Sequence, residues 1–514
     1  MNKENSVLNI VNYGAVDLTN RDVNDYIDST VAIQAAIDEA LLTGKPVYIP
    51  VGKFLVSNLH ITGKAGITII GERQPDDEHQ TGSVLLCNGQ SCLLFDRIDG
   101  SFQYQVVLKN FGIIHISNAT ASIHFKNIQE SYISDVGIWC QNNTVNVGVD
   151  LDGAGIFNID KLLVSRAKKG IKMHHGTLPN PQAIGGCNIS NCNIYYADDS
   201  IEIGYTLGLN IHHNWIEGFQ NGILITNDND SSKIEVSTLN ITDNSFTQST
   251  GELIQTRGVI AKTNSLDTPV TLDMVIKNNL FYMSSSNSIK PDTAIELDIP
   301  DMLSPVSGDI SISDNRLFGT TVAGVITNTS RIKTRVSSNN ICLDDLFGNP
   351  CDLVRRNNNG VVITDAIALE TSRPLVTSEN NGNEHTLKQL MLPEYITGKN
   401  GVIIISTIWS MNNNANIKWL RIRLWDMYGW MPLEFNAAGN NFVIVKTEIS
   451  CINSFQNVLL TSYVTGDITG NKITRLGGIV DLRNNTPLLF NTHLGDPSND
   501  YVTLEDLNVT ILPR

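Results

Sequence analysis

The chain has 514 residues, 41% of them hydrophobic, so it can bury a large core spread over about two to four domains. Its 52 acidic and 36 basic residues give a formal net charge of -16, and no Lys/Arg block offsets this charge, so a nucleic-acid partner is not expected. The N-terminus MNKENSVLNIVNYG lacks the apolar core of a signal peptide, and apolar runs such as GVIIISTIW (401–409) are too short to span a membrane. We therefore expect synthesis in a cytoplasm and no membrane insertion.

Eight cysteines do not form a disulfide framework in so long a chain, and no CxxC pair or His-rich partner suggests zinc. Buried free thiols are expected, with no metal and no cofactor.

A helix is predicted over about residues 29–43. Asp28 or Ser29 can cap its free N–H groups, and Gly44 follows as a stop. Between them, one apolar stripe at helical spacing consists of Ile33, Ile37 and Leu41. The period then changes, and PVYIPVGKFLVSNLHI and ITIIGE indicate short strands.

A six-residue pattern follows, apolar at its first and sixth positions and often Asn at its fourth. It can be placed nine times, at intervals of 22 to 36 residues, starting at Val107, Ile133, Ile159, Ile189, Ile211, Ile241, Ile276, Ile312 and Val336. In the first four copies the fourth position is Asn110, Val136, Leu162 and Cys192, so the apolar frame persists better than the Asn. Most copies carry a second short strand downstream, such as GVDLD (148–152) or AIELD (294–298). Such units without intervening helices are typical of a parallel solenoid.

The recurring Asn has a structural interpretation. Each coil must bend sharply between two strands, and Asn tolerates the left-handed conformation better than other non-Gly residues. We expect a ladder of hydrogen-bonded amides formed by Asn214, Asn244, Asn279 and Asn315.

The last part of the chain differs. Residues 356–384 are polar and aperiodic, which indicates a linker, and residues 385–514 carry strands separated by turn residues, which predict an antiparallel β-sandwich. Four of the six tryptophans lie there, and a core or a subunit interface is favoured over a sugar-stacking platform.

Residues 12–72 resemble the opening of the pectate-lyase-like superfamily. The resemblance rests on Tyr13-Gly14-Ala15, on the AIQAAID helix at 32–38, and on Tyr48, Pro50 and Gly52. It implies an all-β fold: a right-handed parallel β-helix, a single-stranded solenoid, with an N-terminal capping helix and a C-terminal antiparallel β-sandwich. Its expected parts are residues 1–45 (N-terminal segment and capping helix), 46–355 (catalytic β-helix), 356–384 (linker) and 385–514 (sandwich for trimerisation or carbohydrate binding).

The superfamily includes glycoside hydrolases, polysaccharide lyases, epimerases and bacteriophage tailspikes, so the reaction must be inferred from the site. A β-helix followed by a sandwich, without a signal peptide, resembles the tailspike branch. That resemblance implies a homotrimeric capsule or lipopolysaccharide depolymerase, made in the host cytoplasm and acting outside the cell as part of the virion. The family signature begins by residue 12, so attachment to the phage tail is expected through a short N-terminal peptide or an adaptor protein.

Strand alternation gives the candidate catalytic residues. Hydrolysis of a glycosidic bond needs a carboxylic acid and a carboxylate, about 5 to 9.5 Å apart. Alternation turns carboxylates of the second strands outward to solvent, and two pairs lie two residues apart: Asp150 with Asp152, and Glu296 with Asp298. Glu202 with Glu217 is a further possibility.

Substrate-binding candidates lie around these carboxylates. With Ile211 and Ile216 inside, His212, Trp215 and Glu217 are expected to point outward, and Trp139, Tyr195 and Tyr282 fall at the position of Glu217 on other coils. An exposed aromatic column could stack sugar rings, although packing against a subunit or loop explains it equally well. Lys172 and His174 are expected beside the carboxylates.

Two alternatives remain open. A lyase on the same fold would use a base such as Lys, Arg, His or Tyr beside a uronic acid, often with calcium, but no calcium-type Asp cluster is visible. A non-catalytic receptor-binding spike would bind the polysaccharide without cleaving it. A secreted plant-cell-wall enzyme is disfavoured, because no signal sequence is visible.

Overall fold

The structure of this protein is a computed structural model. It describes residues 6–21, 26–63, 66–75, 81–96, 103–141, 144–153, 155–174, 185–227, 234–247, 256–263, 269–283, 293–299, 306–318, 323–327, 332–336, 340–343, 354–356, 361–363, 367–372, 375–377, 385–392, 402–413, 415–416, 418–426, 429–451, 457–466, 472–479, 486–494 and 501–512. The chain divides into two compact units. Unit 1 comprises Met1–Lys333, Asn340–Leu353 and Asn357–Gly360, and unit 2 comprises Thr334–Asn339, Val354–Arg356 and Val361–Arg514.

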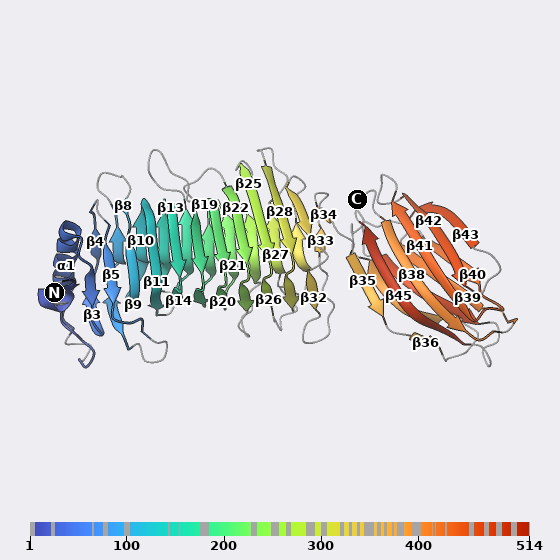
Figure 1. Cartoon of the computed structure of the whole chain (residues 1–514), viewed down its shortest axis with the longest axis horizontal. Coiled ribbons are helices and arrows are strands. Elements are labelled where there is room, and N and C mark those ends of the chain that lie inside the picture. The colour runs from blue at the N-terminus through green and yellow to red at the C-terminus, as the bar shows by residue number, and fades with distance from the viewer. Residues whose placement is uncertain are drawn as a thin grey trace. The chain divides into compact units, whose positions relative to one another are not determined.

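The predicted helix is confirmed as α1 (Thr30–Thr43), which ends at Gly44 in the left-handed conformation. Asp28 accepts the Thr30 N–H at 2.7 Å, so it is the side chain that caps the first turn. The helix lies at the N-terminal end of the stacked strands of unit 1 (Figure 1). Within the described residues, no helix is long and apolar enough to cross a membrane.

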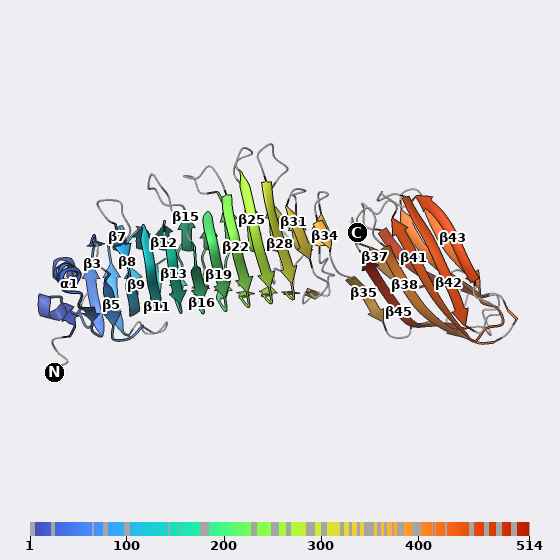
Figure 2. The ribbon, with the colours of Figure 1, turned by 45° about the horizontal axis from the view of Figure 1, so that its top comes forward.

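Parallel strands stacked along unit 1 confirm the parallel β-helix (Figures 1 and 2). One sheet, called sheet B below, contributes one strand per coil. Its strands are β4 (Leu59–Ile61), β7 (Ser91–Phe95), β10 (Ala119–Lys126), β12 (Val145–Asp152), β15 (Lys169–His174), β18 (Asp199–Ile203), β21 (Asn221–Thr226), β24 (Arg257–Lys262), β27 (Thr293–Asp298) and β30 (Ala323–Thr327).

The other sheet, sheet A, contributes a longer and a three-residue strand to most coils. The long strands are β13 (Gly155–Asp160), β16 (Cys187–Ser190), β19 (Tyr205–His212), β22 (Ile234–Thr242), β25 (Val270–Lys277) and β28 (Val306–Ser313). The short ones are β14 (Leu163–Ser165), β17 (Asn193–Tyr195), β20 (Trp215–Glu217), β23 (Ser245–Thr247), β26 (Leu280–Tyr282), β29 (Arg316–Phe318) and β32 (Ile341–Leu343). Nearer the N-terminus this sheet holds β1 (Leu8–Asn9), β2 (Val47–Ile49), β3 (Gly52–Val56), β5 (Thr68–Gly71), β6 (Ser83–Cys87), β8 (Gln103–Tyr104), β9 (Val107–His115) and β11 (Ile128–Cys140).

The apolar frame of the repeat forms the core of the coils. Its first position pairs from coil to coil in a fully buried column made of Ile133, Ile159, Ile189, Ile211, Ile241, Ile276 and Ile312. One frame was wrong: Leu108, and not Val107, pairs with Ile133, so the first copy begins one residue later. Its fourth position is therefore Phe111, which is buried.

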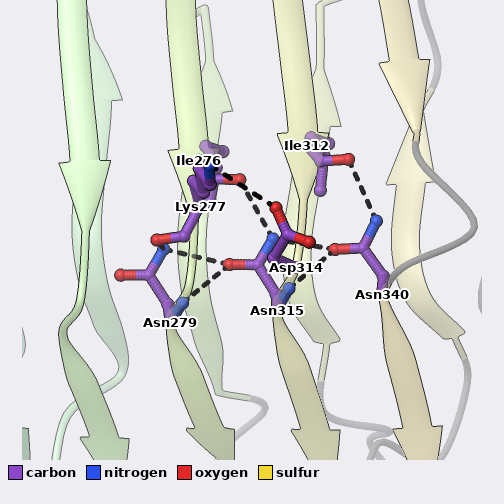
Figure 3. Close-up of polar contacts among 7 residues, drawn as sticks. All are labelled: Ile276, Lys277, Asn279, Ile312, Asp314, Asn315 and Asn340. Atoms are coloured by element: carbon purple, nitrogen blue, oxygen red, sulfur yellow. Dashed lines mark hydrogen bonds and ion pairs between the residues drawn. The ribbon is translucent and has the colours of Figure 1, made fainter.

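The predicted asparagine ladder is confirmed (Figure 3). Asn279 Oδ1 accepts the backbone N–H of Asn244 at 3.0 Å, and Asn279 Nδ2 donates to Asn315 Oδ1 at 3.0 Å and to the Ile241 carbonyl at 2.9 Å. The same contacts recur along the buried column Asn214, Asn244, Asn279, Asn315 and Asn340. The ladder ends on Asn340, so the Asn expected at position 339 is displaced by one residue, and Asn339 lies outside the described residues.

The left-handed conformation expected of these asparagines was wrong. It falls on the residue before each of them: His213 (φ 57°), Asp243 (57°), Asn278 (56°) and Asp314 (57°). The physical reason is that the two positions differ in direction. The corner residue faces outward, and the following Asn turns inward, where its amide can satisfy buried backbone groups.

A second asparagine ladder, unpredicted, runs along the outer face of sheet A. Asn188 Nδ2 donates to Asn158 Oδ1 at 2.7 Å, Asn210 to Asn188 at 2.9 Å, and Asn240 to Asn210 at 2.8 Å. Its signal is an Asn directly before the first Ile of four successive copies.

Unit 2 contains two antiparallel sheets, and two of their strands lie within residues 356–384, where a linker was predicted. One comprises β35 (Ile367–Ser372), β36 (Leu375–Thr377), β38 (Val402–Met411), β41 (Phe442–Cys451), β42 (Asn457–Gly466), β43 (Lys472–Ile479) and β45 (Val502–Leu512). The other comprises β37 (His385–Leu392), β39 (Lys418–Asp426), β40 (Gly429–Asn436) and β44 (Thr486–Leu494). Trp409 is fully buried and donates its indole N–H to Thr407 Oγ1 at 2.7 Å, so it is a core residue. The closure of both sheets into one sandwich stays a prediction.

The cysteines of the first coils are free and buried, as expected: Cys87, Cys92, Cys140, Cys187 and Cys192. The side chains of Cys342, Cys351 and Cys451 lie outside the described residues.

Candidate active site

Ionisable side chains gather on the outer face of sheet B, over strands β10 to β18. Strand register places His124, Asp150, Lys172 and Glu202 directly opposite one another on four successive coils. The column beside it holds Lys126, Asp152 and His174, again in register. We call these seven residues the sheet B cluster.

Asp150, Asp152 and His174 are in contact at its centre. His174 Nε2 lies 2.8 Å from Asp150 Oδ1, and His174 Nδ1 lies 3.9 Å from Asp152 Oδ1. The exposed fractions of Asp150, Asp152 and His174 are only 8%, 4% and 6%. The two carboxylates are two residues apart on one strand, which separates their Cα atoms by about 6.6–7 Å.

The surroundings of Asp150 keep it ionised. Burial favours its neutral form, but the hydrogen bond from His174 and the charges of His174 and Lys172 outweigh burial and hold the pKa of Asp150 below its ordinary value. His124 Nε2 lies 3.7 Å from Asp150 Oδ2, on the side opposite His174 along the stack. Burial lowers the pKa of His124, so this imidazole is neutral at neutral pH.

Glu202 belongs to the cluster by position, but its carboxylate has another partner. Its Oε2 contacts Lys169 Nζ at 2.5 Å, and Glu202 is 6% exposed. Lys126, at the other end, pairs with Asp96 at 2.9 Å. These ion pairs flank the Asp150–His174–Asp152 contact.

The structure does not bring Glu296 and Asp298 to the cluster. They lie on β27, five coils beyond β12, which is roughly 24 Å away at a coil spacing of about 4.8 Å. Leu224 and Ile260 interrupt the column between Glu202 and Glu296. Glu296 instead contacts Arg257 Nε at 2.5 Å.

The exposure expected for Asp150, Asp152 and Glu202 was wrong. They lie on the outer face, as alternation predicts, but they are buried rather than open to solvent. The alternation of residues along a strand predicts only whether a side chain points into or out of its own coil. It does not predict whether neighbouring side chains or loops cover the outer face of sheet B. Among the described residues, no group of three or more His, Cys, Asp or Glu is placed to hold a metal ion.

His124, Lys126, Lys169 and Asp96 were not predicted for this site. The signal existed: aligning SIHFK (122–126) with VDLD (149–152) would have put His124 over Asp150. The repeating pattern lies on the first strand of each coil, and the variable spacing to the second strand hides the register of β10.

The column of Glu217 lies on sheet A, on another face. Its register is as expected: Trp139, Ser165, Tyr195, Glu217, Thr247 and Tyr282 follow one another. Glu217 and Glu202 therefore lie on different sheets and do not form a pair. His212 Nδ1 lies 2.9 Å from His213 Nδ1.

The aromatic residues of this face differ in their surroundings. Trp215 is 50% exposed, and Tyr195 and Tyr282 are half-buried. Trp139 does not form an open platform as expected, because it packs over Gly112 and Gly137 against the buried cluster around Leu18.

Residues 7–224 match the family model for rhamnogalacturonase A/epimerase, pectate lyase-like. The pectate-lyase-like resemblance of this part of the chain is therefore confirmed. No curated protein matches the sequence.

Solved structures similar to this chain include two phage proteins and a glucanase. The enzymatically active domain of tailspike protein 2 of bacteriophage CBA120 is 12% identical, with 98% of this chain and 82% of that chain covered and a TM-score of 0.43. The gp42 tailspike of Acinetobacter phage vb_AbaP_AS12 is 10% identical, with 92% and 82% covered and a TM-score of 0.46. The catalytic unit of the thermostable GH87 alpha-1,3-glucanase from Streptomyces thermodiastaticus strain HF3-3 is 14% identical, with 70% and 68% covered and a TM-score of 0.45.

Proposed function

We propose that this protein hydrolyses glycosidic bonds of a polysaccharide at the sheet B cluster. The observation that carries the proposal is the buried contact of Asp150, His174 and Asp152, which places two carboxylates on one face and keeps one of them ionised. Burying so many charges opposes folding, so a cluster of this kind on a β-helix face is more readily explained by chemistry than by stability. The match to a model named for a rhamnogalacturonase supports a carbohydrate substrate.

The geometry assigns roles to the two carboxylates. Asp150 is ionised and acts as the base that removes a proton from the attacking water. Asp152 supplies the proton that the leaving glycosidic oxygen takes up. Their Cα atoms are about 6.6–7 Å apart, and we assign them an inverting reaction, in which a water molecule lies between the two carboxyl groups. The hydrogen bond from His174 orients Asp150, and the same imidazole lies 3.9 Å from Asp152.

The finer assignment is a phage tailspike depolymerase that acts on a capsule or lipopolysaccharide chain. It is supported by the resemblance at residues 12–72 and by the succession of a parallel β-helix and antiparallel sheets along one chain. On this proposal the protein is a homotrimer attached to the phage tail through its N-terminal segment, either directly or through an adaptor. The β-helix carries catalysis, and residues 385–514 serve trimerisation or carbohydrate binding.

The test uses purified capsular and lipopolysaccharide preparations from a panel of bacterial strains. Each is incubated with the protein, and new reducing ends, viscosity and the masses of released oligosaccharides are measured. The proposal expects new reducing ends with at least one preparation and none with the Asp150→Asn variant. Binding without any new ends would instead support a receptor-binding spike.

A lyase is the second candidate, and the imidazole of His124 favours it. Its low pKa makes it a neutral base 3.7 Å from Asp150, and Lys172 lies in the same column. Elimination leaves a conjugated double bond that absorbs in the ultraviolet, whereas hydrolysis does not. Ultraviolet absorbance appearing together with the new ends would overturn hydrolysis in favour of elimination.

A further inference from the structure

The short strands of sheet A carry an aromatic residue that the fold does not require. Trp215 begins β20, and its neighbours in register are Asn193 on one coil and Ser245 on the other. Further along the column the same position is Leu280. Residues so different in size and polarity show that stacking of the coils does not select Trp here.

Trp215 is also unlike a structural tryptophan. Half of it is exposed, and among the described residues none accepts a hydrogen bond from its indole N–H. Trp409, in contrast, is fully buried with its N–H bonded. The indole ring of Trp215 is thus exposed on a strand, and its N–H group can donate a hydrogen bond to a ligand.

Tyr196 provides a second exposed aromatic ring, one coil before Trp215. Its φ is 54°, a left-handed conformation that is strained for a bulky residue, and it is 45% exposed. One coil later the equivalent position is Gly218, with φ 67°, the residue that such a conformation favours. The corner is also left-handed on the coil before, at Arg166 with φ 62°, so the fold sets this conformation and the exposed ring is what distinguishes Tyr196.

The side chains around the two rings indicate what they contact. The outward neighbours Asn193, Ser245 and Glu217 offer hydrogen-bonding groups, and Tyr195, in register with Glu217, adds a half-buried aromatic ring. The core of a protein interface is depleted of charged residues, whereas here Glu217 and the polar side chains of Asn193 and Ser245 flank the Trp215 ring. A pyranose ring matches the arrangement, because its C–H face can stack on an aromatic ring while its hydroxyl groups bond to the polar rim.

We infer that Trp215 and Tyr196 form a saccharide-binding platform, separate from the sheet B cluster, that holds a second stretch of the same polysaccharide. The inference rests on the proposed function for the identity of the ligand. Three residues along the chain and one coil separate the two rings, which corresponds to roughly 11 Å between Cα atoms. That span accommodates about two sugar rings. The platform would raise the affinity for long chains without taking part in bond cleavage.

The experiment measures binding where cleavage is blocked. In an Asp150→Asn background, Trp215→Ala and Trp215→Phe are compared by affinity electrophoresis in gels that contain the purified capsular or lipopolysaccharide preparation. We expect Trp215→Ala to weaken binding about 10-fold and Trp215→Phe to retain most of it. Leu280→Ala, in the same column and also exposed, is the matched control and should change binding by less than about twofold.

Activity and mass measurements complete the test. In the otherwise unaltered protein, Trp215→Ala should raise KM for the polymer and leave kcat on a short oligosaccharide unchanged. Unaltered binding by Trp215→Ala would overturn the platform, and so would a change in native mass, which would make this face a contact between copies of the chain. If the protein binds polysaccharide but never cleaves it, the proposed hydrolysis is wrong and the platform stands. If it binds no polysaccharide, both the proposed hydrolysis and the platform are wrong.

Discussion

His174 and Asp150 lie on neighbouring coils, both are buried, and Nε2 of His174 is 2.8 Å from Oδ1 of Asp150. The contact is diagonal, since strand register places His174 opposite Asp152. One imidazole is therefore hydrogen-bonded to Asp150 and lies 3.9 Å from the carboxylate of Asp152.

Replacement of His174 should move the acid limb of activity. Its hydrogen bond and charge help to hold the pKa of Asp150 below the ordinary value, so His174→Ala should raise that pKa. Asp150 would then lose its charge at a higher pH. The dependence of kcat/KM on pH should show the acid limb shifted upward, whereas an unchanged limb would exclude Asp150 as the base.

The same linkage predicts the effect of acid on stability. The pKa of Asp150 is lower in the folded state, so its contribution is present above the unfolded pKa and is lost as pH falls through the folded pKa. Guanidinium unfolding at a series of pH values should show less acid destabilisation in Asp150→Asn than in the wild type below about pH 4. Equal acid destabilisation in both proteins would contradict the assigned direction of the pKa shift.

Removal of either central carboxylate should abolish most activity. Asp150→Asn and Asp152→Asn should each lower kcat on the order of 10³-fold, because each removes one proton-transfer group. Glu296→Gln, which alters a carboxylate five coils away, should leave kcat within about twofold. Reducing-end assays give the comparison, and circular dichroism checks the fold. A large loss of kcat in Glu296→Gln would indicate that the active site lies at Glu296 and not at the sheet B cluster.

The inner asparagine ladder should matter more for stability than the outer one. Asn279→Ala removes the partners of a buried Asn244 N–H and a buried Ile241 carbonyl, so we expect a loss of about 3 kcal/mol in the free energy of unfolding. Asn240 lies on the outer face, where water replaces the lost bonds, so Asn240→Ala should cost less than about 1 kcal/mol. Chemical denaturation of both variants checks the difference, and equal losses would contradict it.

The contrast between the ladders shows what the sequence could predict. The inner ladder could be predicted because Asn recurs at one position of the apolar frame. When the coils stack, residues at the same position of successive copies lie next to one another. The corner conformation could not be assigned in this way: His213, Asp243, Asn278 and Asp314 share φ but not chemistry. The sheet B cluster was predicted only in part, because its burial and the contacts of His124 depend on the register between strands more than twenty residues apart.

Replacement of Tyr196 by Gly should raise the stability of the protein and weaken its binding of polysaccharide. Its left-handed conformation costs an ordinary residue about 1–2 kcal/mol, and Gly recovers part of this while losing more entropy on folding, so Tyr196→Gly should stabilise the protein by up to about 1 kcal/mol. It should also weaken polysaccharide binding in the Asp150→Asn background. Ile156→Gly is the matched control, since Ile156 is exposed at φ 49° and the next coil has Gly186 in its place. Ile156→Gly should gain similar stability in thermal unfolding and bind polysaccharide as before. Equal loss of binding in both variants would attribute the effect to the backbone and not to the tyrosine ring.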